Sequence, residues 1–159
     1  MTVISTIPDR EKLQLTMVAE FDAPVEEVWQ VWEDPRKLEK WWGPPTWPAT
    51  FTDFDFSEGG AAEYHMTGPD SEKAPGYWRF QAIETNRRIQ IQDGFANEDG
   101  SMNEEMPTMV MTMTLDEEGG KTTMTTVSKF NSIEDLEQLL EMGMAEGMTL
   151  AMGQIDGLL

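Results

Sequence analysis

The chain has 159 residues, 39% of them hydrophobic, with six Trp, seven Phe and two Tyr, which predicts a single domain over residues 1–159. Eleven Lys and Arg against 30 Asp and Glu give a formal net charge of −19, so we expect neither nucleic acid nor an anionic membrane surface as a partner. Cysteine is absent and His65 is the only histidine, which excludes disulfides and the usual zinc sites, and we expect no metal or other cofactor. No apolar run reaches the roughly 18 residues of a membrane span, and no leader is evident, so a cytoplasmic protein is expected.

The N-terminal part predicts one strand followed by two short helices. Residues 12–21 alternate apolar and polar side chains, which is the period of a half-buried strand. Asp22-Ala-Pro24 supplies a helix start, and from Val25 the apolar residues recur at i, i+3, i+4 and i+7. Asp34-Pro35 repeats the start pattern and predicts a second helix from Arg36 to Trp42.

The middle of the chain has the pattern of an antiparallel meander. Short segments rich in Thr, Val, Ile, Phe and Met are divided by Gly, Pro, Asp and Asn clusters. Gly119-Gly120 predicts a tight hairpin, and the acidic stretch 97–105 predicts an exposed loop. The expected strands are 50–56, 60–67, 76–84, 87–93, 107–115 and 121–130.

One long helix is predicted at the C-terminal end, over residues 132–156. Ser132 and Asp135 form an approximate capping box at its start. Gly143 and Gly147 lie inside it, and each interior glycine costs about 0.5 to 1 kcal/mol relative to alanine. Two explanations stay open: close approach of the helix backbone to the sheet, or space for a ligand.

These elements predict an α+β fold in which the last helix covers the apolar face of a curved antiparallel sheet of about seven strands. An ordered set of motifs runs through them: Phe21-Asp-Ala-Pro24 with Val28-Trp29, Trp41-Trp42-Gly43-Pro44, Glu58-Gly59-Gly60, Thr67-Gly68-Pro69-Asp70, Asp93-Gly94-Phe95 and Met142-Gly-Met-Ala-Glu-Gly-Met148. The set resembles the helix-grip (START/Bet v 1-like, SRPBCC) superfamily, in the branch named for the activator of Hsp90 ATPase. Two departures, Ala62 in place of a frequent aromatic and Met148 in place of a frequent Trp, predict a larger or softer interior.

The resemblance implies a cavity between the sheet and the final helix, and strand alternation selects the side chains expected to face it. Methionine is prominent among them, and its flexible side chain can repack around ligands of different shapes. The alternative is that these residues simply fill a core. The expected cavity residues are Phe54, Phe56, Tyr64, Met66, Trp78, Phe80, Ile89, Ile91, Met109, Met111, Met113, Met124, Met144 and Met148.

The leading functional hypothesis is binding of a small apolar molecule in this cavity, without catalysis. The alternative is a polyketide-cyclase-like or hydrolase-like enzyme, which a buried carboxylate with a raised pKa would favour and a wholly apolar lining would not. The polar residues that could serve such an enzyme in or beside the cavity are Asp53, Asp55, Tyr77 and Arg79. Strand alternation turns His65 outward, and no catalytic residue is assigned. A second alternative is an Hsp90 co-chaperone-like interaction module. The eukaryotic co-chaperone of that branch has a separate chaperone-binding domain without a counterpart in these residues, so we expect no Hsp90 partner.

Two of the tryptophan sites raise the question of oligomeric state. Trp47 and the Trp41-Trp42 pair are expected either to form a homodimer contact or to pack locally.

Overall fold

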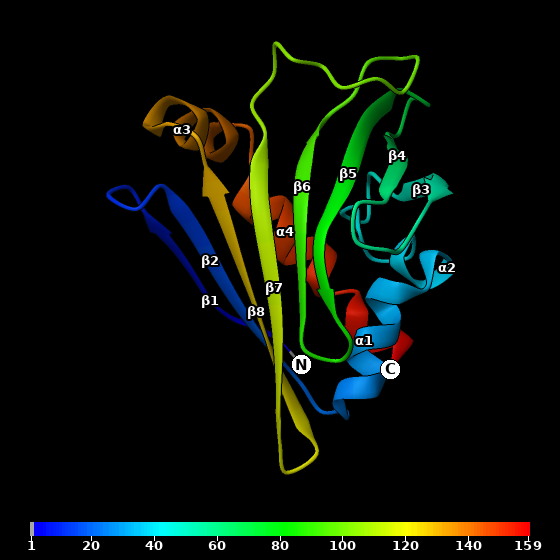
Figure 1. Cartoon of the computed structure of the whole chain (residues 1–159), viewed down its shortest axis with the longest axis vertical. Helices are drawn as coiled ribbons and strands as arrows, with labels where there is room; N and C mark the ends of the chain where they lie inside the picture. Colours follow the sequence, from blue (N-terminus) through cyan, green and yellow to red (C-terminus); the bar gives the residue numbers. More distant parts are fainter. Residues whose placement is uncertain (1) are drawn as a thin grey trace.

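One curved antiparallel sheet dominates the protein, with its helices gathered on one side (Figure 1). The structure, a computed structural model, describes residues 2–159, with side chains from residue 5 onward. The strand order in the sheet is β1-β2-β8-β7-β6-β5-β4-β3. The strands are β1 (Thr2–Asp9), β2 (Gln14–Phe21), β3 (Ala49–Phe54), β4 (Ala61–Thr67), β5 (Lys73–Glu84), β6 (Arg88–Phe95), β7 (Met109–Glu118) and β8 (Lys121–Phe130).

The described strands number eight, not about seven, because the sequence analysis missed β1. This strand pairs only with β2, at the edge of the sheet. Its described side chains are mostly exposed, and Ile7 is 58% exposed. An edge strand without a buried face shows no clear apolar alternation, and Pro8 is a residue that strands tolerate chiefly at edges. The other seven strands agree with the predicted segments to within a few residues.

Two helices follow β2, as predicted. α1 (Val25–Glu33) buries Val28, Trp29, Val31 and Trp32. In α2 (Pro35–Leu38) the Asp34 carboxylate caps the helix by accepting the Arg36 N–H at 2.9 Å. This helix ends at Leu38, short of the predicted Trp42, and turns continue the chain.

The prediction of one long C-terminal helix was wrong. The segment contains α3 (Ile133–Glu141), α4 (Met144–Met152) and a 3₁₀ turn, η1 (Ile155–Leu158). Gly143 separates α3 from α4 with φ of +86°, a left-handed conformation that glycine adopts readily and that interrupts an α-helix. The predicted cap is confirmed, because the Ser132 hydroxyl accepts the Asp135 N–H at 3.1 Å.

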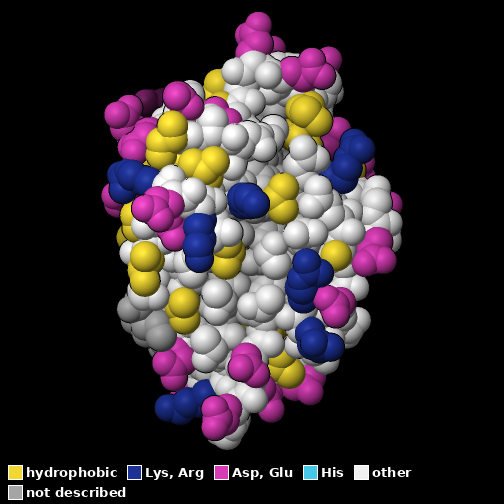
Figure 2. Space-filling view, turned by 60° about the vertical axis from the view of Figure 1, so that its left-hand side comes forward, with side chains coloured by type: hydrophobic (Ala, Val, Ile, Leu, Met, Phe, Trp, Pro, Cys, Tyr) yellow, Lys and Arg dark blue, Asp and Glu magenta, His cyan; other side chains and the backbone are white. Residues whose placement is uncertain are grey.

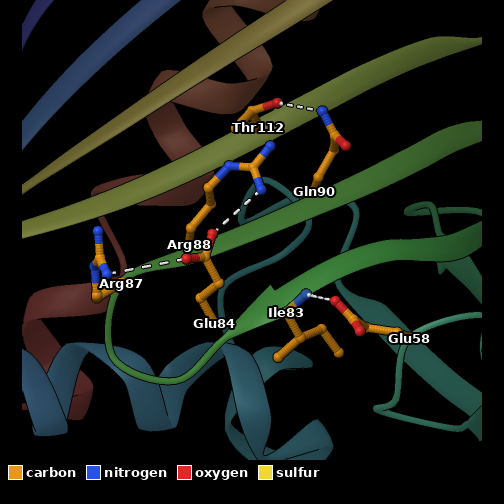
Figure 3. A network of polar contacts seen from close by, with 7 residues as sticks. All are labelled: Glu58, Ile83, Glu84, Arg87, Arg88, Gln90 and Thr112. Atoms are coloured by element: carbon orange, nitrogen blue, oxygen red, sulfur yellow. Dashed lines mark hydrogen bonds and ion pairs between the residues drawn. The ribbon is translucent and has the colours of Figure 1, made fainter.

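The outer face of the sheet is polar. In Figure 2 hydrophobic side chains are scattered singly, with basic side chains across the middle of the view and acidic ones mainly toward its ends. At the β5–β6 turn, Glu84 pairs with Arg87 and Arg88, while Gln90 donates to the Thr112 hydroxyl across β6 and β7 (Figure 3). Exposed pairs of this kind contribute little to stability, so the free energy of folding comes mainly from the inner face.

That inner face is rich in aromatic side chains. Trp41 and Trp42 are both buried, with the Trp41 indole N–H donating to the Val31 carbonyl at 2.8 Å, so this pair packs locally. The Trp42 ring lies 4.7 Å from Trp78, measured between ring centroids. This aromatic cluster packs between α1 and the sheet, since Trp29 and Trp32 of α1 contact Phe56 and Trp78.

A candidate ligand cavity with a buried carboxyl

A cavity of about 300 Å³ lies between the sheet and the C-terminal helices. This volume lies near the lower end of the roughly 300 to 1,000 Å³ found for ligand sites. A core filled by side chains was the alternative, and a void of this size argues against it. The wall comes from the loop after α2 (Trp41, Trp42, Pro44), from β4 (Tyr64, Met66), from β5 (Ala74, Pro75, Gly76), from β6 (Asp93, Gly94, Phe95), from Pro107 and Met109, from α3 and the turn after it (Leu139, Met142, Gly143), and from α4 (Met144, Gly147, Met148, Ala151, Met152).

The structure separates the fourteen predicted cavity residues into two groups. Five line this cavity: Tyr64, Met66, Met109, Met144 and Met148. Nine do not, and seven of these are essentially fully buried: Trp78, Phe80, Ile89, Ile91, Met111, Met113 and Met124. The remaining two, Phe54 and Phe56, are partly buried and pack against the core.

The cause of this division is the position of each residue along its strand. Alternation selected the inward face of β7 correctly, since Met111 and Met113 are buried while Thr114 is exposed. At that level of the sheet, however, other side chains fill the interior. The Phe80 ring, for example, lies 5.2 Å from Phe56 and 6.1 Å from Trp78 between centroids. Facing inward and lining a cavity are therefore different properties.

The cavity contains one carboxyl group, that of Asp93 on β6. Asp93 is 7% exposed, and its Oδ1 accepts a hydrogen bond from the Tyr64 hydroxyl at 3.1 Å. Burial raises the pKa of Asp93 from 3.8 to about 7, although the Tyr64 hydroxyl, the Gly94 backbone N–H and the Trp78 indole N–H act in the opposite direction. Burial, followed by the Asp93 charge, raises the pKa of Tyr64 well above its usual value. Near neutral pH Asp93 therefore gains or loses its proton, while Tyr64 stays protonated.

Unused hydrogen-bond donors lie around this pair. The Trp42 indole N–H lowers the pKa of Tyr64, yet its nitrogen has no partner at full hydrogen-bonding geometry among the described residues. The Trp78 indole N–H likewise lowers the pKa of Asp93, and its nitrogen also has no partner at full hydrogen-bonding geometry among the described residues. Since buried donors are normally satisfied, these two indole nitrogens are exceptions beside the Tyr64–Asp93 pair.

Gly76 on β5 positions the Tyr64 ring. Tyr64 and Gly76 are directly opposite in the β4–β5 register, and a Cβ at residue 76 would overlap the end of the phenol ring. β4 and β6 are two strand spacings apart, about 10 Å, with β5 between them. The Tyr64 side chain thus crosses β5 over a residue without a side chain and reaches Asp93.

Sequence reasoning missed Asp93 as a polar group in the cavity. The polar points named instead lie elsewhere: Asp53, Asp55 and Arg79 are exposed, and Tyr77, although buried, does not line the cavity. The pattern that identifies Asp93 is the alternation of β6, because Ile89, Ile91 and Asp93 share the inward face.

His65 lies between Tyr64 and Met66 on β4, is partly buried and is not part of the cavity wall. Burial is the main cause of the lowered pKa of its imidazole. No group of three His, Asp or Glu side chains suited to a metal ion occurs in the described part of the chain. No helix within residues 2–159 is both long and apolar enough to cross a membrane.

The surroundings of Gly147 distinguish between the two explanations for a glycine inside the C-terminal helix, close approach to the sheet or space for a ligand. A Cβ at Gly147 would meet no atom within 4 Å, so close approach of the backbone to the sheet does not explain this residue. Gly147 lines the cavity, and its missing side chain enlarges the space beside α4. Gly143 has a different reason, namely its positive φ at the helix break.

Comparison with protein families gives a match to the model described as "Activator of Hsp90 ATPase homolog 1-like protein", over residues 22–159. The chain belongs to this family. The AHSA1-like resemblance inferred from the motifs is thereby confirmed, as is the helix-grip fold of the START/Bet v 1 superfamily. A comparison with curated proteins gave no match.

Several proteins of known structure are similar over most of this chain. A protein from Arthrobacter aurescens is 49% identical, with a TM-score of 0.95 over 99% of this chain and 91% of that one. Protein Ms6760 from Mycobacterium smegmatis is 45% identical, with a TM-score of 0.91 over 99% of this chain and 96% of that one. DynU16, described as a putative protein in the dynemicin biosynthetic locus, is 17% identical with a TM-score of 0.63 over 91% of this chain and 46% of that one, which shows the shared fold alone.

Proposed function

We propose that this protein binds a small, largely apolar molecule in the cavity between the sheet and the C-terminal helices. The observation that carries the proposal is the cavity itself, about 300 Å³ and walled mainly by Met, Trp, Pro and small residues. Ligand sites of this kind combine an apolar wall with a few polar groups that fix orientation, here Tyr64 and Asp93. Met142 and Ala74 line the cavity and are exposed, which supports access to it from solvent.

A filled cavity should no longer bind. The neutral fluorophore N-phenyl-1-naphthylamine is expected to bind the wild-type protein with enhanced emission. Gly147→Leu is expected to weaken binding by at least about tenfold, because open space surrounds this position and a leucine side chain would take up part of the cavity. Fluorescence titration measures the dissociation constant of each variant.

The matched control is Thr149→Leu, two residues further along α4. Thr149 is exposed and its hydroxyl only donates to the Ala145 carbonyl, so the added leucine lies outside the cavity and affinity should change by less than about twofold. Equal affinities of wild type and Gly147→Leu, or no binding by the wild-type protein, would contradict the proposal.

Acid–base catalysis is a second candidate, supported by the buried Asp93 whose pKa lies near 7. The Asp93 carboxylate lines the cavity and is suited to accept a proton from a carbon next to a carbonyl. If this holds, 1-tetralone in D₂O should exchange its C2 protons about 100-fold faster with the protein than in buffer, and Asp93→Asn should remove the gain. Proton NMR follows the exchange; a bound tetralone that exchanges at the buffer rate would refute catalysis.

No feature of this cavity bears on the co-chaperone alternative, and the expectation that Hsp90 is not a partner stays a prediction.

A further inference from the structure

The single carboxyl of the cavity has no cationic partner. Tyr64 and Asp93 are the titratable residues among the lining side chains, and no Lys or Arg is present there. Among the described residues Asp93 takes part in no ion pair, and the Tyr64 hydroxyl donates its hydrogen bond. A carboxylate placed in apolar surroundings without a counter-charge is costly, and a bound cation removes that cost.

The rest of the wall is suited to hydrocarbon. The lining residues from α3, α4 and the turn between them are all Leu, Met, Gly or Ala. Met144 and Met148 are partly buried and flexible, so they can pack against chains or rings of different shapes. The cavity therefore has one acidic point and an otherwise apolar wall.

From this arrangement we propose that the ligand is an amphiphilic amine, whose ammonium group binds the Asp93 carboxylate while its hydrocarbon body lies against the Met wall of α4. The inference rests on the proposed ligand-binding function and specifies its chemical class. An ammonium group fits better than a hydroxyl because hydrogen bonds between ionised partners are the stronger ones. A carboxylate or phosphate ligand is disfavoured, because the lining offers no positive charge and the whole chain carries a net charge of −19.

The charge state of Asp93 makes such binding depend on pH. The groups around it are Tyr64 on β4 and Tyr77 on β5; Arg79 on β5 is exposed, and the parts of β7, α3 and α4 that line the cavity contribute no titratable side chain. The Asp93 pKa of about 7 leaves roughly 3% of the carboxyl ionised at pH 5.5 and 90% at pH 8. Since an aliphatic amine stays protonated over this range, its affinity should rise on the order of 30-fold from pH 5.5 to pH 8.

The experiment measures displacement of N-phenyl-1-naphthylamine by octylamine, octan-1-ol and octanoate in 150 mM salt. For the wild-type protein at pH 8, octylamine is expected to bind at least about tenfold more tightly than octan-1-ol, with octanoate weakest. At pH 5.5 the preference for octylamine should largely disappear. In Asp93→Asn, octylamine and octan-1-ol should bind with affinities within about threefold of each other at both pH values. Circular dichroism first verifies that this variant is folded.

Glu146→Gln is the matched control, because it removes the same charge from an exposed position on α4. It should keep the octylamine preference; loss of the preference there would attribute it to surface charge and overturn the inference. A wild-type protein that binds octan-1-ol as tightly as octylamine at pH 8 would overturn the amine but leave the proposed function intact. Failure to bind the fluorophore and octan-1-ol would instead remove the proposed function. The wild-type comparison needs no variant, so the test stands even if Asp93→Asn does not fold.

Discussion

Trp78→Ala is expected to lower the free energy of unfolding by about 3 to 5 kcal/mol, the usual cost of removing a fully buried large aromatic side chain. Trp78 has no exposed surface, and its ring lies 4.7 Å from Trp42 and 5.2 Å from Phe51 between centroids. The substitution leaves a void at the centre of the aromatic cluster. Because whole domains are stable by about 5 to 15 kcal/mol, the loss is a large part of the total. Urea unfolding followed by circular dichroism measures it.

The same change at Trp47 provides the control for residue type. Trp47 is only partly buried, so Trp47→Ala should cost about 1 kcal/mol, near the average for single substitutions. If Trp78→Ala costs no more than Trp47→Ala, the aromatic cluster does not have the role in stability assigned to it.

The stability of the wild-type protein relative to Asp93→Asn is expected to fall as pH rises from 4 to 8. The folded protein keeps the Asp93 proton up to about pH 7, whereas an unfolded aspartate releases it near 3.8. Between those values the folded state binds more protons, so rising pH favours unfolding. The difference 7 − 3.8 is about 3 pH units, which corresponds to about 4 kcal/mol at 1.36 kcal/mol per unit. The contribution is complete below about pH 4 and lost by about pH 8.

Urea unfolding of both proteins at several pH values measures this difference, and the comparison cancels the general repulsion among the acidic side chains. Asp99→Asn supplies a control of opposite sign. Hydrogen bonds from Ser101 lower the pKa of the exposed Asp99, so the wild-type protein should gain stability relative to that variant as pH rises. A free-energy difference between wild type and Asp93→Asn that does not change with pH would show that Asp93 ionises normally.

The strands could be predicted from sequence because each buried strand repeats its apolar side chains every two residues. The pattern failed for β1, whose exposed side chains have no need to alternate. It also failed at the last helix, since a left-handed residue such as Gly143 looks the same in sequence as the helical Gly147. Only the backbone conformation of the folded chain distinguishes these two glycines.

The cavity was harder to predict than the fold. Alternation states which way a side chain points, but the volume left empty depends on what approaches from the other side. Met109 borders the cavity, whereas Met111 on the same face is packed against other residues. Asp93 was named only as part of a motif and not as a cavity residue, because with 30 acidic residues in the chain a single carboxyl carries little weight. Its position after Ile89 and Ile91 was the distinguishing observation.

The route of the Tyr64 side chain over Gly76 restricts how this site can evolve. A protein that keeps the phenol at position 64 must keep glycine at position 76, because any Cβ there overlaps the ring. Once position 64 becomes small, that restriction disappears, and the buried carboxyl at position 93 loses its hydrogen-bond donor. The three positions on three adjacent strands are therefore linked in one direction: the phenol at position 64 requires glycine at position 76, and the carboxyl at position 93 relies on the phenol for its hydrogen bond.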